Sequence, residues 1–187
     1  MIRGTFVALI DEVLDGLGDP GLEQIAAMLG TGRDKAREVI EAASGVVVGG
    51  LADNAEHPEG AEALRGALDE HADADPFNSD VASLTRDGLG ILTHVLGGQG
   101  VEEAAWGVAR LAGVDAGPVM KLLPLIAPMV MSLLAEHAAR DRLDAAEVAA
   151  RLERERAALP RDLDEVLIAV FDGPVWQQAH GAQNPDW

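Results

Sequence analysis

A short acidic run, DEHADAD from Asp69 to Asp75, carries carboxylate and imidazole groups of the kind that bind metal ions. A calcium-binding loop places oxygen ligands at alternating positions and needs a glycine for its sharp turn. Counted from Asp73, Phe77 takes a ligand position and Asn78 takes the glycine position, so the pattern fails. We interpret the run as solvated acidic surface and predict no bound metal.

Histidines and serines are the other groups that could do chemistry. His137 and Asp141 have the spacing of one helix face, but no third zinc ligand is evident. Ser44, Ser79, Ser83 and Ser132 lack a nucleophile-elbow sequence, and no triad partners are evident for the five histidines. The chain has no cysteine, which excludes thiol nucleophiles and thiolate metal sites. We therefore predict no catalytic residue.

His94 stands apart because it lies inside an apolar helical segment, GILTHVLGG. A lone histidine in such a segment is more often a packed, hydrogen-bonded core residue than a catalyst. The alternative is a ligand-binding or enzymatic pocket near His94, between two repeats of the chain. Both interpretations stay open at this point.

Two further motifs suggest anionic ligands. Gly97-Gly98-Gln99-Gly100 precedes a helix, but Glu102 and Glu103 in its first turn repel phosphate, so we predict no nucleotide cofactor. LEQIAAMLGTGRDKAREVI resembles a helix-turn-helix, with Arg33, Lys35 and Arg37 on the second helix. The net charge of −18 opposes contact with a phosphate backbone. DNA binding is therefore the third functional hypothesis, and no nucleic-acid partner is expected.

Apolar residues recur at helical spacing along the chain, and no strand-like alternation appears. The stretch from Ile25 to Ala55 aligns without a gap on the stretch from Val108 to Ala138, at a constant offset of 83, as from Gly30 to Gly113. The apolar positions match, whereas the basic residues of the first copy have no counterpart. We predict an all-α, internally duplicated multihelical bundle with two central apolar helices, the second kinked by Pro124 and Pro128.

This pattern predicts four parts of the chain. Residues 1–72 form a first helical repeat, 73–80 a linker, 81–140 a second repeat packed on the first, and 141–187 the C-terminal helices and tail. The longest apolar run, from Leu122 to Ala135, contains two prolines and is shorter than the roughly 20 residues of a membrane span. With no convincing signal peptide, we expect a cytoplasmic protein without a membrane span.

The C-terminal part carries apolar and aromatic side chains in an otherwise aromatic-poor chain. They are Val166, Ile168, Val170, Phe171, Trp176 and Trp187. Such a segment is typical of docking, either onto the protein's own body or onto a partner. Gly45 and Gly49 form a small-residue helix face, which we expect to mediate contact between the two halves of the chain.

Three segments, ADNAEHPEGAEALRGALDEH, GILTHVLGGQ and VMKLLPLIAPMVMSLLAEH, resemble the YidB-like family of bacterial proteins, a family of domains of unknown function. The resemblance extends from about Phe6 to Ala138. It implies an all-helical, internally duplicated fold and assigns no catalytic residue. The leading hypothesis is a non-enzymatic structural or interaction protein that self-assembles or binds a protein partner.

Overall fold

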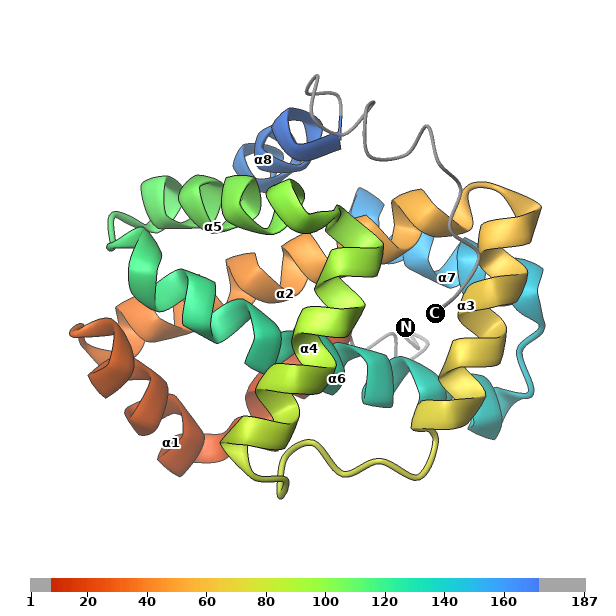
Figure 1. Ribbon diagram of the computed structural model, residues 1–187, viewed down its shortest axis with the longest axis horizontal. Helices are drawn as coiled ribbons and strands as arrows, with labels where there is room; N and C mark the ends of the chain where they lie inside the picture. The colour runs from red at the N-terminus through yellow and green to blue at the C-terminus, as the bar shows by residue number, and fades with distance from the viewer. Residues whose placement is uncertain (1–7, 172–187) are drawn as a thin grey trace, which may run out of the picture.

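The computed structural model describes residues 8–171, and within them every regular element is a helix, which confirms the all-α class. The helices are α1 (Leu9–Leu29), α2 (Arg33–Ala55), α3 (Pro58–His71), α4 (Val81–Leu96), α5 (Gly98–Ala112), α6 (Ala116–Asp141), α7 (Ala145–Ala157) and α8 (Arg161–Phe171). Figure 1 shows α4 crossing in front of α6 and α8 lying above α5.

Helix α1 is broken at Gly18, where the sequence predicts the end of a first helix. Gly18 has φ 63° and ψ −174°, a conformation that glycine adopts readily, and Pro20 follows at the start of the next turn. The N-terminal part of α1 therefore changes direction before the chain enters the Leu22–Leu29 segment.

The turns after α1 and α5 are alike. Gly30 and Gly113 both have left-handed backbone angles, and the N–H groups of Thr31 and Val114 donate to the carbonyl oxygens of Ala26 and Ala109, each at 3.0 Å. The donors and the acceptors of the two hydrogen bonds are each 83 positions apart, which is the offset that aligns the two sequence copies. This likeness concerns the turns, and the duplication of complete halves stays a prediction.

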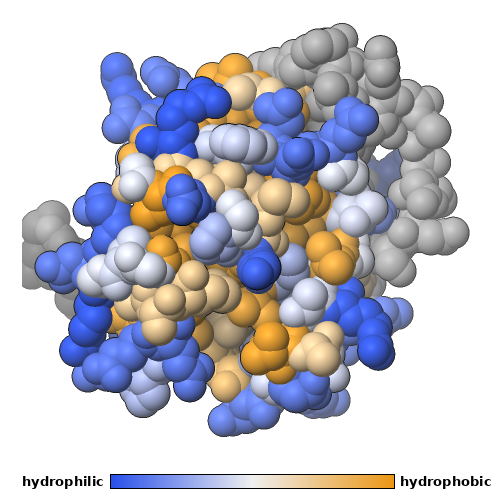
Figure 2. All heavy atoms as spheres, turned by 60° about the vertical axis from the view of Figure 1, so that its left-hand side comes forward, coloured by the Kyte–Doolittle hydropathy of each residue, from blue (hydrophilic) through white to orange (hydrophobic). Residues whose placement is uncertain are grey.

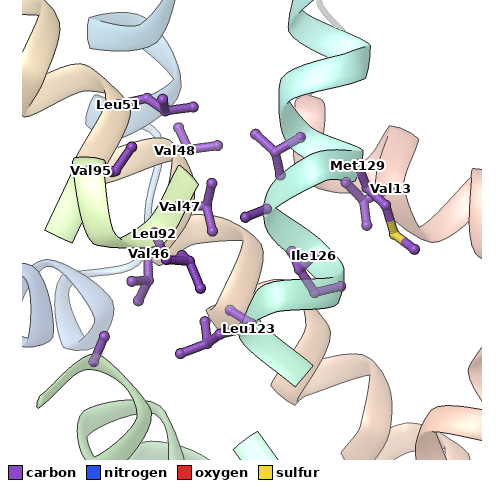
Figure 3. Close-up of a cluster of buried hydrophobic side chains, with 14 of the residues drawn as sticks. Val13, Val46, Val47, Val48, Leu51, Leu92, Val95, Leu123, Ile126 and Met129 are labelled. Carbon is purple, nitrogen blue, oxygen red and sulfur yellow. The ribbon is translucent and has the colours of Figure 1, made fainter. Parts of the chain in front are cut away.

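The core is built mainly from α2 and α6, which pack against each other and contribute 15 buried residues each. Figure 3 shows Val47 and Val48 of α2 on the side of α2 nearest α6. Leu92 of α4 closes this cluster on one side, and Val13 of α1 lies beside Met129 on the other. The GVVV sequence, residues 45–48, is helical although valine favours strands.

Helix α6 is long and apolar enough to cross a membrane by length and composition. However, 67% of its most apolar window is buried inside the protein. This burial is what a core helix of a globular protein requires, and the expectation of no membrane span stays a prediction.

Pro124 and Pro128 lie inside α6 without ending it. Pro128 has no N–H to donate to the carbonyl oxygen of Pro124, four residues earlier. Gly88 of α4 packs directly over this oxygen, and a Cβ added at Gly88 would overlap it. The glycine therefore lets α4 cross α6 at very short range.

The small-residue face of α2 is occupied by the C-terminal helix. A Cβ at Gly45 would meet the side chain of Leu163, and one at Gly49 would meet Leu167. The small-residue face makes its contact within one chain, as expected. However, it contacts α8 and not the second half of the chain, so the predicted contact between the halves at this face is wrong. Two glycines one turn apart form a groove that fits the leucines of α8.

The segment from 73 to 80 leads from α3 to α4 and contains no helix, as its prediction as a linker requires. Its Phe77 ring packs against Gly16 of α1. Helix α3 contacts both α2 and α6, while α7 contacts α2 and α3. The four predicted parts of the chain stay a prediction.

Candidate functional site

The C-terminal segment predicted to mediate docking is mostly packed against the protein itself. Val170 and Phe171 are buried, and Val166 is half-buried against Gly107 of α5. Ile168 is 47% exposed on the opposite face of α8. Helix α8 therefore packs on α2 and α5 of the same chain, and docking of the segment onto a partner stays a prediction. Trp176 and Trp187 lie outside the described residues.

His94 is half-buried on the last turn of α4. The groove described below lies between α2, α3 and α7, and His94 does not line it. The alternative hypothesis of a ligand site near His94, and the role of His94, stay predictions.

Two of the three basic residues of the helix-turn-helix-like segment, Arg33 and Lys35, form ion pairs with acidic neighbours. Arg33 Nη2 lies 2.5 Å from Asp19 Oδ1, and Lys35 Nζ lies 2.6 Å from Glu38 Oε2. The continuation of α2 beyond these residues is buried in the core. A helix with two of its three basic side chains already paired, and which continues into the core, is poorly suited to act as the recognition helix of a DNA-binding protein.

A buried carboxylate joins α7 to the start of α1. Glu155 is only 2% exposed, and both of its oxygens accept from the Leu9 N–H at 3.3 Å. Arg151 Nη2 lies 3.7 Å from Glu155 Oε1. Burial raises the pKa of Glu155, whereas the Leu9 N–H and Arg151 lower it. The Glu155 carboxylate thus supplies an acceptor for one of the N–H groups at the start of α1 that have no partner within the helix.

His137 joins α6 to α1 close to the same end of α1. Its Nε2 lies 2.7 Å from Glu12 Oε2, and its Nδ1 contacts Arg140 Nη2. Because arginine only donates, Nδ1 accepts and the Nε2–H donates to Glu12. Both ring nitrogens are thus engaged, and the imidazole has no free nitrogen for proton transfer. The contact is structural.

The acidic residues singled out in the sequence are dispersed. Asp69 pairs with Arg65 on the same helix, with Oδ1 and Nη1 2.5 Å apart, and Asp75 accepts a hydrogen bond from Asn78. Within residues 8–171 no group of three histidine or carboxylate side chains is placed to hold a metal ion. Asp141 pairs with Arg140 instead of joining His137 in a ligand set.

Large apolar side chains are exposed on three helices that contact one another, α4, α5 and α6. Trp106 is 56% exposed, Leu89 46%, Leu111 43% and Met120 40%. Figure 2 shows apolar side chains across the middle of one side of the molecule, with charged side chains around them. We call Leu89, Trp106, Leu111 and Met120, the exposed apolar residues of three helices in mutual contact, the apolar face.

Sequence reasoning missed this apolar face, although one signal was present. Trp106 stands four residues after Glu102 and four before Arg110, so it lies on the polar stripe of α5. A tryptophan on a polar stripe is expected to be exposed.

A groove of about 550 Å³ runs between α2, α3 and α7. Alanines of these three helices form its apolar lining, and four charged residues stand around it. The alanines include Ala52, Ala55, Ala61, Ala149 and Ala150, and the charged residues are Glu56, Glu62, Glu153 and Arg156. The groove could not be predicted from the sequence, because it arises where α7 packs on helices far away in the chain. We call it the alanine groove.

Comparison with known proteins places the chain in a family without assigning a reaction. Neither the curated proteins nor the solved structures give a significant match. The family described as bacterial protein of unknown function (DUF937) matches residues 11–137, more than half of the chain. YidB belongs to this family, so the match confirms the resemblance noted in the sequence. The chain is therefore a member of the DUF937 family of bacterial proteins of unknown function.

Proposed function

We propose that this is a non-enzymatic interaction protein that assembles with copies of itself through the apolar face. One observation carries the proposal: Trp106, one of only three tryptophans in the chain, is 56% exposed, on a helix that contacts two other helices with exposed apolar side chains. Exposed clusters of this kind mark interaction sites, and tryptophan is enriched among the residues that dominate binding energy.

The buried ionisable groups support a role without catalysis. Glu155 and His137 are both engaged in contacts that hold α1 against α6 and α7. A catalytic acid or base must be able to reach a substrate, and these two groups are occupied by the fold.

The proposal is tested by measuring the mass of the full chain in solution by analytical ultracentrifugation. We expect an assembly that Trp106→Ser with Met120→Ser converts to monomer, because exposed apolar contacts are lost at little cost to the fold. Ile168→Ser, an exposed apolar residue on α8, is the matched control and should leave the assembly intact.

A strictly monomeric wild-type chain over the whole concentration range would refute the proposal. If Ile168→Ser dissociates the assembly and the double variant of Trp106 and Met120 does not, the apolar face is not the interface. The interface would then lie on α8.

A further inference from the structure

The alanine groove combines an apolar floor with negative charges that have no counterpart in it. Ala52, Ala55 and Ala61 are buried at the floor, and their short side chains leave the space open. Glu62 and Glu153 are exposed and form no ion pair within residues 8–171, whereas Glu56 pairs with Arg156 at 3.5 Å. The alanine groove thus has an apolar floor and, on its walls, two carboxylates without an ion-pair partner among these described residues.

We propose that the alanine groove binds a basic, amphipathic segment of another protein. Apolar side chains of the segment would fill the trench, and its lysine or arginine residues would pair with Glu62 and Glu153. The argument is charge complementarity: opposite charges around an apolar contact fix orientation and speed association. The net charge of −18 adds a long-range attraction for a basic partner.

The same charges disfavour the other occupants. Residues 172–187 of this chain contain Asp172 and Asp186 and no lysine or arginine, so they bring no positive charge to the groove. A second copy has the same excess of acidic residues, so it brings no net positive charge to pair with Glu62 and Glu153. The groove is also distinct from the apolar face, and the inference is independent of self-assembly.

The test uses the full chain and a labelled amphipathic peptide built from leucine and lysine, followed by fluorescence anisotropy. We expect Glu62→Gln with Glu153→Gln to weaken binding roughly five- to tenfold, as the loss of two exposed charge pairs predicts. Glu102→Gln with Glu103→Gln on α5 changes the net charge equally and should have much less effect. If the two double variants weaken peptide binding equally, the peptide is attracted by the overall charge alone, and the proposal is overturned.

Filling the groove provides a second measurement that leaves the charge unchanged. Ala150→Leu adds bulk at an exposed position in the groove, and we expect it to weaken the peptide severalfold. Ala169→Leu at an exposed position on α8 is the matched control and should not. Unchanged binding by Ala150→Leu would overturn the proposal.

Three other outcomes would identify a different occupant and also overturn the proposal. The first is equally tight binding of a peptide with glutamate in place of every lysine. The second is equally tight binding of a synthetic peptide of residues 172–187. The third is loss of self-assembly in Ala150→Leu, which would place a second copy in the groove.

Discussion

The carboxyl group of Glu155 is buried where α7 meets the start of α1. Burial raises its pKa above the ordinary value of 4.5, and the charges of Glu12 and Asp11 on α1 act in the same direction, against Leu9 N–H and Arg151. The folded protein therefore holds this proton more tightly than the unfolded chain between the two pKa values. In that window the contribution of Glu155 to stability decreases as the pH rises.

Glu155→Gln removes this titration while keeping an oxygen that can accept from Leu9. We expect the stability of the variant relative to wild type to increase as the pH rises from about 4.5 through the raised pKa, and to be constant below about 4.5. Urea denaturation at a series of pH values measures this difference. A relative stability that falls with pH would mean that the carboxylate is stabilised in the folded state.

Ser44 on α2 is fully buried, and its hydroxyl has no hydrogen-bond partner among the described residues. A buried hydroxyl without a partner costs about 1–3 kcal/mol of desolvation. We expect Ser44→Ala to leave the protein equally stable or to stabilise it by up to about 1 kcal/mol. Ser132→Ala is the comparison, because the Ser132 hydroxyl donates to the Ala74 carbonyl oxygen at 2.9 Å. A larger loss from Ser44→Ala than from Ser132→Ala in thermal unfolding would contradict this.

These contacts could not be predicted from the sequence. Glu155 and Leu9 are separated by 146 positions, and His137 and Glu12 by 125. Each residue type is common on helix surfaces, so only the packing of α1 on α6 and α7 selects the partner.

At the scale of helices, the crossing of α4 over α6 depends on one missing side chain. A Cβ at Gly88 would overlap the backbone oxygen of Pro124, which cannot move as a flexible side chain can. We expect Gly88→Ala to destabilise the protein by about 2 kcal/mol or more. Gly90→Ala, on the same helix with nothing within 4 Å, should be neutral or stabilise it by about 0.5–1 kcal/mol. Equal stability of the two variants in urea would show that α4 does not approach α6 so closely.

Helix boundaries could be predicted where the local signal is strong. Asp144 and Glu147 form a reciprocal capping box at the start of α7, as the acidic residues at that point suggest. Thr31, with Asp34 three residues later, matches a weaker form of the capping box and predicts the start of the helix there, but this prediction is wrong. The helix begins at Arg33, Gly32 is the N-cap residue and no side chain caps it. The Thr31 hydroxyl donates to the Gly32 carbonyl oxygen instead.

At the scale of the whole molecule, the net charge of −18 sets the salt dependence of both proposed contacts. Copies of the chain repel each other, so we expect self-assembly to tighten between about 0.05 and 0.5 M NaCl, as salt screens the repulsion. Binding of the basic peptide should weaken over the same range, because salt screens an attraction. Sedimentation measures self-assembly and fluorescence anisotropy measures peptide binding at each salt concentration, and the two should change in opposite directions. An assembly that dissociates with added salt would indicate an interface held by ion pairs.

The sequence by itself determined the all-α class, and glycine at positions 18, 30 and 113 permits the positive φ angles found there, because periodicity and glycine conformation act within a few residues. Only the tertiary structure decided that α8 fills the Gly45 and Gly49 face, that Gly88 lies on Pro124, and that the alanine groove opens between α2, α3 and α7. These features depend on distances between helices far apart in the chain. Many side chains of similar size and polarity satisfy the same local pattern, and close packing of the whole core selects which of them meet.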